Sequence, residues 1–215
     1  MSKSCWDIKS DDIARALRCA LRQYRTQARL SWLALVDDLT GLCNRRAFLL
    51  LAREHMNLAR RKKKALLLFY ADLDNLKQIN DQFGHQEGDR ALRQAADIFR
   101  ATFRKSDITA RFGGDEFAAL VREDAGYGAK AISGRLRKNM QELAAREHRY
   151  RLSLSVGMTR YVPESSESLE DLLARADHAL YRHKRVARPA WRKGLLAFPV
   201  PAEQTAAAEA ALVWP

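Results

Sequence analysis

Two glycines followed by two acidic residues stand between two short apolar runs near the middle of the chain, in the segment Arg111-Phe112-Gly113-Gly114-Asp115-Glu116-Phe117. Two such runs joined by a glycine pair predict a β-hairpin. Glycine has no side chain and tolerates positive φ, so a large ligand could rest against the backbone there. Carboxylates at such a turn suit a hard metal ion that carries phosphates. The alternative is an ordinary exposed hairpin with a polar turn, and the turn by itself does not decide between the two.

Charge and composition narrow the class of protein. The 215 residues allow one domain with extensions, and the net charge of +12 indicates anionic partners such as nucleotides, nucleic acid or an acidic membrane surface. No apolar run approaches the roughly 20 residues of a membrane helix, and the first residues lack an apolar signal region. Cys5, Cys19 and Cys43 lack the spacing of a metal site, which predicts reduced thiols in a cytoplasmic protein.

Residues 1–36 are predicted to form an amphipathic helix. An apolar stripe recurs at helical spacing through Leu17, Leu21, Tyr24 and Ala28, and arginines at intervals of three and four residues form a basic face. A solvated face is the simple interpretation. The alternatives are a coiled-coil seam that pairs two chains, and a surface that touches acidic lipid or a protein partner.

Residues 37–188 are predicted to form one domain of helices and strands. The expected helices are 44–63, 86–103, 125–148 and 168–186, and the expected strands are 65–72, 108–112, 116–121 and 150–157. This order predicts an α+β fold, in which helices flank one antiparallel-rich sheet. Residues 189–215 hold four of the five prolines and an alanine-rich run, which predicts a poorly ordered tail.

Acidic residues also follow the first predicted strand. Asp72 and Asp74 are two residues apart, so they point to the same side of an extended chain. Asp72 would lie beside Asp115 if the hairpin were its neighbour in the sheet. Two such carboxylates are the minimum for a paired magnesium site that acts on a nucleoside triphosphate, although Asp-x-Asp alone is more often a loop motif.

Two further segments carry groups that suit a nucleotide. In the expected loop after Asp74, the amide of Asn80 and the carboxylate of Asp89 match the donors and acceptors of guanine, whereas His85 is interpreted as an ordinary loop histidine. On the last helix, Lys184 and Arg188 share one face and could hold phosphates. A solvated basic face is the alternative there.

Together these segments resemble those of the GGDEF family of diguanylate cyclases. The resemblance runs from residue 37 to residue 188 through the segments 38–48, 72–77, 80–89, 113–117, 155–157 and 177–181. It implies a fold related to the polymerase palm and the nucleotidyl cyclases. It also implies a reaction in which two GTP give cyclic di-GMP and two pyrophosphates across a homodimer, with Mg²⁺, or Mn²⁺ as an alternative, and with no nucleic-acid partner.

The resemblance implies roles for individual residues as well. Asp72, the carbonyl of Leu73 and Asp115 would bind the metal, and Glu116 would either join them or assist deprotonation of the 3′-hydroxyl. The residues implied to hold GTP are Asn80 and Asp89 at the base, Lys77, Lys184 and Arg188 at the phosphates, and Gly113 and Gly114 where the nucleotide approaches the backbone.

Arg104 and Asp107 form an Arg-x-x-Asp pair just before the hairpin. Their offset from Gly113 matches the family's inhibitory site, where the product cyclic di-GMP would bind. An ion pair at the end of a helix is the alternative interpretation.

Two functions remain open from the sequence alone: an active diguanylate cyclase, and a non-catalytic module that binds GTP or cyclic di-GMP. The presence of Asp72, Asp115 and Glu116 favours the enzyme. The chain departs from the family pattern at Leu76, where an aromatic residue is usual, and at Ala187, where glycine is usual. Neither departure removes a ligand.

Deleting residues 1–30 tests the predicted pairing of two N-terminal helices. We expect the truncated protein to lose cyclase activity when dilute and to regain it when concentrated, because tethering raises the effective concentration of the two domains that must meet. The measurement is specific activity over a dilution series of both proteins. Specific activity that is independent of concentration in both forms would contradict the pairing.

Overall fold

The computed structural model describes residues 35–145, 149–150 and 152–191, with side chains as far as Arg185. Two units follow each other along the chain, Met1–Val36 and Asp37–Pro215. The apolar stripe and basic face predicted within residues 1–36, and the predicted tail beyond residue 191, lie outside the described residues. In the part that is described, none of the helices has the length and apolar character needed to cross a membrane.

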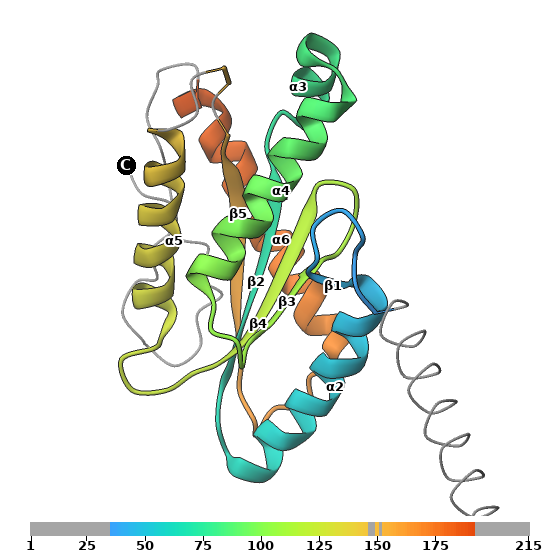
Figure 1. Ribbon diagram of the computed structural model, residues 1–215. Coiled ribbons are helices and arrows are strands. Elements are labelled where there is room, and N and C mark those ends of the chain that lie inside the picture. Colours follow the sequence, from blue (N-terminus) through green and yellow to red (C-terminus); the bar gives the residue numbers. More distant parts are fainter. Residues whose placement is uncertain (1–34, 146–148, 151, 192–215) are drawn as a thin grey trace, which may run out of the picture. The chain divides into compact units, whose positions relative to one another are not determined.

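The domain consists of one five-stranded sheet and its flanking helices (Figure 1). Its elements, in chain order, are β1 (Cys43–Asn44), α2 (Arg45–Lys62), β2 (Leu66–Leu73), α3 (Leu76–Phe83), α4 (His85–Thr102), β3 (Ile108–Arg111), β4 (Glu116–Arg122), α5 (Ala129–Ala144), β5 (Leu154–Tyr161) and α6 (Leu169–Trp191). The strand order is β1-β3-β4-β2-β5, and every pair is antiparallel except β1–β3. The predicted α+β fold is therefore confirmed.

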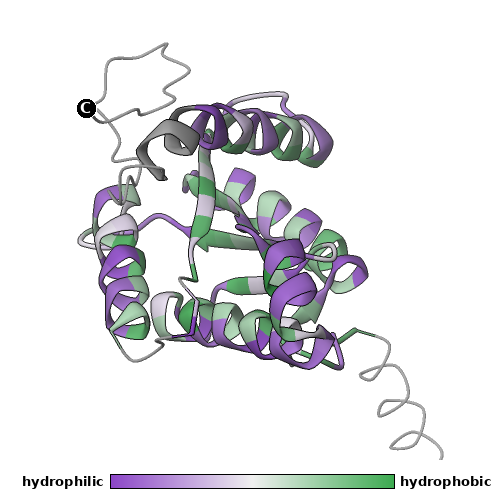
Figure 2. Cartoon of the chain, turned by 90° about the horizontal axis from the view of Figure 1, so that it is seen from above, coloured by the Kyte–Doolittle hydropathy of each residue, from purple (hydrophilic) through white to green (hydrophobic). Residues whose placement is uncertain are grey.

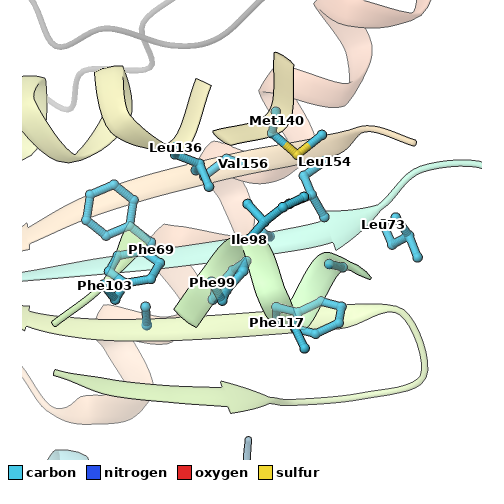
Figure 3. Close-up of a cluster of buried hydrophobic side chains, with 14 of the residues drawn as sticks. Phe69, Leu73, Ile98, Phe99, Phe103, Phe117, Leu136, Met140, Leu154 and Val156 are labelled. Carbon is cyan, nitrogen blue, oxygen red and sulfur yellow. The ribbon is translucent and has the colours of Figure 1, made fainter. Parts of the chain in front are cut away.

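Helices cover both faces of the sheet, because side chains alternate along its central strands. On β2, Leu67 and Phe69 face a cluster built with α4 and α5, part of which is drawn in Figure 3. Leu68 and Tyr70 face a second cluster built with α2 and α6. Figure 2 shows the same division, with hydrophobic stripes turned inward and hydrophilic ones outward. A strand buried on both faces explains why β2 reads as a continuous apolar run.

The predicted bounds of three elements were wrong. Helix α6 runs to Trp191 rather than ending at residue 186, so residues 189–191 of the predicted tail are helical. Helix α5 begins at Ala129 rather than Ala125, because Gly126 has a φ of 76° and Asp124 pairs with Tyr127 in a reversal of the chain. Strand β5 spans Leu154–Tyr161 rather than 150–157. Its extent is decided by its partner, since β5 pairs with β2 along the whole length of β2.

The segment after β2 was predicted to be a loop but holds the short helix α3. Asn75 precedes it with a φ of 61°, and Ile79 is its buried residue. Gly88 lies inside α4. The loop prediction was wrong because a helix of eight residues with one buried position carries little periodic signal.

Helix α6 packs unusually closely on β5 at Gly157. A Cβ atom at this position would overlap backbone atoms of Ala176 and Leu180. Only glycine therefore lets the backbone of α6 approach the sheet this closely. This approach determines where the later residues of α6 lie relative to the end of β2.

Replacing Gly157 with Ala should destabilise the domain by about 2–4 kcal/mol, because backbone atoms on both sides cannot move aside as a side chain can. Gly134, in α5, is the matched control, since a Cβ there meets no atom within 4 Å. Gly134→Ala should stabilise the domain by about 0.5–1 kcal/mol. Denaturant unfolding of both variants measures the two effects. Equal changes in stability would show that the close packing has no energetic consequence.

Candidate active site

The turn between β3 and β4 is held by its own backbone and by one arginine. The backbone N–H groups of Phe112 and Gly113 donate to the Glu116 carbonyl at 2.7 and 3.3 Å. The Arg111 guanidinium donates to the Gly114 carbonyl at 2.7 and 3.1 Å. It also forms an ion pair with Asp37 at 3.3 Å, which joins the turn to the first residue of the domain. The predicted hairpin is confirmed.

The two glycines of the turn have different surroundings. Neither Gly113 nor Gly114 has a positive φ. A Cβ at Gly113 would lie 2.5 Å from Oε2 of Glu116, so glycine leaves room for that carboxylate. A Cβ at Gly114 meets no atom within 4 Å, so its surroundings are open. The Glu116 carboxylate lies against the first glycine, and the second leaves exposed backbone that a ligand could approach.

The pairing of β2 with β4 brings the predicted acidic residues together. Asp72 lies directly opposite Glu116 in this antiparallel pair. The next residue of β2, Leu73, donates its backbone N–H to the Asp115 carbonyl at 2.8 Å. Asp72, Asp115 and Glu116 therefore lie at the same end of two neighbouring strands, as the sequence predicted.

Lys184 of α6 reaches this group of acids. Its ammonium lies 2.7 Å from Oδ2 of Asp72, and both side chains are half-buried. Burial raises the pKa of Asp72 to about 6, Lys184 opposes the rise, and Asp115 and Asp74 add to it. The site is therefore a place where a positive charge is favoured, and Lys184 supplies one.

Asp74 is held by two serines that the sequence did not single out as its partners. Its two carboxylate oxygens accept from the hydroxyls of Ser153 and Ser155, each at 2.7 Å. Burial raises the pKa of Asp74, while both serines, Lys184 and His183 lower it. The signal lay in the Ser155-Val156-Gly157 segment, but only the pairing of β5 with β2 shows which acid the serines contact.

The residues predicted to read guanine also come together. Asn80 on α3 packs against Gly88 of α4, where a Cβ would overlap the Asn80 amide, and Asp89 is the next residue of α4. Both side chains are half-buried. Lys77, near the start of α3, is exposed, and Arg188 lies in α6 beyond the described side chains.

The donor set fits a magnesium ion. The described residues contain no group of three His, Cys, Asp or Glu side chains arranged as a ready-made metal cage. Magnesium seldom needs one, because one or two carboxylates commonly bind it together with substrate phosphates. Asp72 and Asp115 would supply those carboxylates, with the Leu73 carbonyl. The contact between Asp72 and Lys184 is consistent with this assignment, since it places a positive charge against the Asp72 carboxylate.

A pocket of about 180 Å³ lies at the opposite end of the same strands. Leu66 pairs with Arg122 there, six residues from the Asp72–Glu116 pair. Six residues correspond to about 20 Å along a strand. Arg104 and Asp107 both line this pocket, so the predicted product site is separate from the acids.

Arg104 and Asp107 do not form the ion pair considered as an alternative. Asp107 accepts from the Arg104 backbone N–H at 2.8 Å and from the Tyr127 hydroxyl at 2.6 Å. The Arg104 guanidinium instead lies 3.4 Å from the centre of the Tyr127 ring and 3.8 Å from Asp124. Tyr127 therefore contacts both residues, and no local pattern in the sequence indicated its role.

A family model described as diguanylate cyclase, GGDEF domain, matches residues 34–189. The chain belongs to the GGDEF family.

Similar proteins agree with this assignment. Cyclic di-GMP phosphodiesterase NbdA and diguanylate cyclase DgcP, both from Pseudomonas aeruginosa, are 38% and 39% identical to the chain over 75% and 72% of its length. The chain spans only 21% and 23% of those two proteins.

Solved GGDEF structures share the fold. The coiled coil and GGDEF domain of DgcB from Caulobacter crescentus, in complex with cyclic di-GMP, superposes with a TM-score of 0.69. The two are 28% identical, and the match covers 80% of this chain and 93% of that one. Diguanylate cyclase SiaD in complex with its activator SiaC, from Pseudomonas aeruginosa, gives 0.63 at 31% identity, over 80% of this chain and 68% of that one.

Replacing Lys184 with Met should make the stability of the GGDEF domain more sensitive to pH. The pKa of Asp72 is raised to about 6 from 3.8, so its contribution to stability is fully present below pH 3.8 and is lost as the pH rises through 6. Lys184 limits this rise, so its removal enlarges the loss. Without divalent ions, we expect the fall in Tm from pH 5 to pH 8 to be about 2–4 °C larger than in the wild type.

The matched control is Lys130→Met, which removes an exposed lysine from α5. Its Tm should change with pH as the wild type does. If the Tm of Lys184→Met lies below that of the wild type by the same amount at pH 5 and at pH 8, Lys184 does not stabilise the ionised form of Asp72.

Proposed function

We propose that this chain is a diguanylate cyclase that condenses two GTP into cyclic di-GMP and two pyrophosphates at the interface of a homodimer. The observation that carries the proposal is the gathering of Asp72, Asp115 and Glu116 at one end of β2 and β4, with Lys184 beside them. Such acids, next to exposed backbone at Gly114, suit a metal-bound triphosphate.

In this proposal the acids hold Mg²⁺, with Mn²⁺ as an alternative. The ion supplies the chemistry of phosphoryl transfer when bound, by lowering the proton affinity of the 3′-hydroxyl and offsetting charge on the phosphates. Asp72, the Leu73 carbonyl and Asp115 hold it. Glu116, which lies opposite Asp72 and near Tyr70, either joins them or assists deprotonation of the 3′-hydroxyl.

The substrate is assigned by the groups around the acids. Asn80 and Asp89 bind the guanine edge, since Asp89 accepts from N1–H and N2–H, which adenine cannot offer in the same way. Lys77, Lys184 and Arg188 hold the phosphates. Support comes from the contact of Asn80 with α4 beside Asp89, and from the position of Lys184 among the acids.

Two domains must meet, because each holds one GTP. The predicted helix within residues 1–36 would pair two chains as a coiled coil, and the solved DgcB structure contains a coiled coil with its GGDEF domain. A partner protein could act on the same helix, as SiaD is solved with an activator, SiaC. An acidic membrane surface is the alternative partner, and a cytoplasmic location remains a prediction.

Product inhibition is proposed for the pocket at Arg104 and Asp107. DgcB is solved in complex with cyclic di-GMP, which supports product binding within this family. The pocket is separated from the acids by the length of the strands, so bound product would not displace GTP directly. It would instead hold two domains in an arrangement in which their active sites cannot meet.

Asp115→Asn should reduce formation of cyclic di-GMP by about 100-fold or more, because it removes a metal-binding carboxylate. The fold should survive, since the contact between Asp115 and Leu73 uses the backbone carbonyl of Asp115. Purified protein is incubated with GTP and Mg²⁺, and the product is identified by mass spectrometry. Asp97→Asn, which removes an exposed carboxylate of α4, is the control and should retain activity.

Turnover of Asp115→Asn at the wild-type rate would overturn the metal assignment. A wild-type protein that binds GTP or cyclic di-GMP but forms no product would be the non-catalytic module instead. Circular dichroism of each variant separates loss of activity from loss of fold.

A further inference from the structure

The pocket at Arg104 carries more positive charge than its two acids can balance. It is bounded by the last turns of α2, the start of β2, the turn before β3 and the end of β4. Five basic and two acidic side chains line it, namely His55, Lys62, Lys64, Arg104 and Arg122, with Asp107 and Asp124.

The two acids of the pocket are already engaged. Asp107 accepts from the Arg104 backbone and from the Tyr127 hydroxyl. Asp124 accepts two hydrogen bonds from Arg122, each at 3.3 Å, and lies 3.8 Å from Arg104. Both arginines are thus partly neutralised by Asp124, and neither acid is left to balance the other basic side chains of the lining.

Lys62 and Lys64 line the pocket where α2 ends, and this part of the lining is called the lysine wall. Within the described part of the chain, neither ammonium has an ion pair or a hydrogen bond. Lys62 ends α2, and the chain then reverses at Lys63, which has a φ of 50°. The reversal places Lys62 and Lys64 on the pocket while Lys63 does not line it. Two lysines brought to one wall without a carboxylate suit an anionic ligand.

His55 lies earlier in α2 than these lysines. It is half-buried and lines the same pocket. Burial and Arg122 lower the pKa of its imidazole below 6.5, whereas Asp107 and Glu54 oppose the shift. The other charges around the pocket are Lys62, Lys64, Arg104 and Asp124. Without a bound anion, His55 is therefore neutral at pH 7. A bound phosphate would raise the pKa of His55, because its negative charge favours the imidazolium.

We propose that His55, Lys62 and Lys64 form a phosphate-binding wall in the pocket that Arg104 lines, and that proton uptake by His55 from solvent accompanies the binding of a cyclic dinucleotide. The proposal rests on the product inhibition proposed above, and it adds that the affinity for the product depends on pH. With His55 neutral, the four other cations and two acids leave a net charge of +2 on the pocket lining. A cyclic dinucleotide carries two phosphodiesters and so a charge of about −2.

Calorimetric titration of the full chain with cyclic di-GMP tests the proton uptake. At pH 6, 7 and 8, each titration is run in two buffers of different ionisation enthalpy, which gives the number of protons bound. We expect uptake of at most about half a proton and an affinity up to about tenfold higher at pH 6 than at pH 8, as a pKa shift of about one unit would give. His55→Gln should remove both effects and leave the Kd at pH 8 unchanged.

His178→Gln, an exposed histidine of α6 outside the pocket, is the control and should titrate like the wild type. Arg104→Ala identifies the site, because binding at this pocket should fall sharply in that variant. Wild-type binding that takes up no proton, or proton uptake that persists in His55→Gln, would overturn the role of His55. Absence of binding, or binding unaffected by Arg104→Ala, would overturn the whole proposal.

The lysine wall has its own matched control within the Lys62-Lys63-Lys64 run. Lys62→Gln and Lys64→Gln should each weaken binding about two- to fivefold, whereas Lys63→Gln removes the same charge from the same segment and should bind as the wild type does. Equal losses in all three variants would show that only the general positive field matters.

The test separates this inference from the proposed function. Formation of cyclic di-GMP from GTP decides whether the chain is a cyclase. Binding of cyclic di-GMP to the variants decides whether the proposed wall holds phosphate. If the protein forms cyclic di-GMP but binds it equally well in all of these variants, the proposed function stands and the proposed phosphate-binding wall is wrong. If the protein forms no cyclic di-GMP but shows the expected losses of binding, the proposed wall stands and the proposed cyclase function is wrong.

Discussion

The antiparallel register of β2 and β4 is the constraint on which the site depends. Asp72 lies opposite Glu116 in this register, and the same pairing turns Leu67 and Phe69 toward α4 and α5. A slip of one residue would turn every side chain of β2 to the other face of the sheet. The buried clusters on both faces make such a slip costly, so packing far from the acids keeps Asp72 beside the turn that carries Asp115.

The position of the positive charge follows from packing on the other side of β2. Gly157 lets α6 approach β5 closely, and along the same helix Lys184 reaches Asp72 at 2.7 Å. The serines of β5 hold Asp74 on the same strand end. Burial would otherwise favour protonated carboxyls here, so the lysine and the hydroxyl groups keep the acids available to a cation.

The two ends of the sheet carry different chemistry. One end gathers acids and exposed backbone, and the other gathers basic side chains around a pocket. About 20 Å of strand separates them, beyond the roughly 8 Å over which charges act through physiological salt. In the proposed enzyme, product bound at the basic end would therefore act through the arrangement of two domains, and the state of His55 would tune how tightly it is held.

The sequence by itself determined the elements with strong local signals and the family. Helices α2 and α4, strand β2 and the β3–β4 hairpin were predicted to within about a residue or two at each end, because periodicity and glycine pairs act over short stretches. Only the tertiary structure decided the extent of β5, the helical form of α3, the partners of Asp74 and the role of Tyr127. Each depends on contacts between residues far apart in the chain, and a local pattern carries no information on which strand or side chain lies opposite.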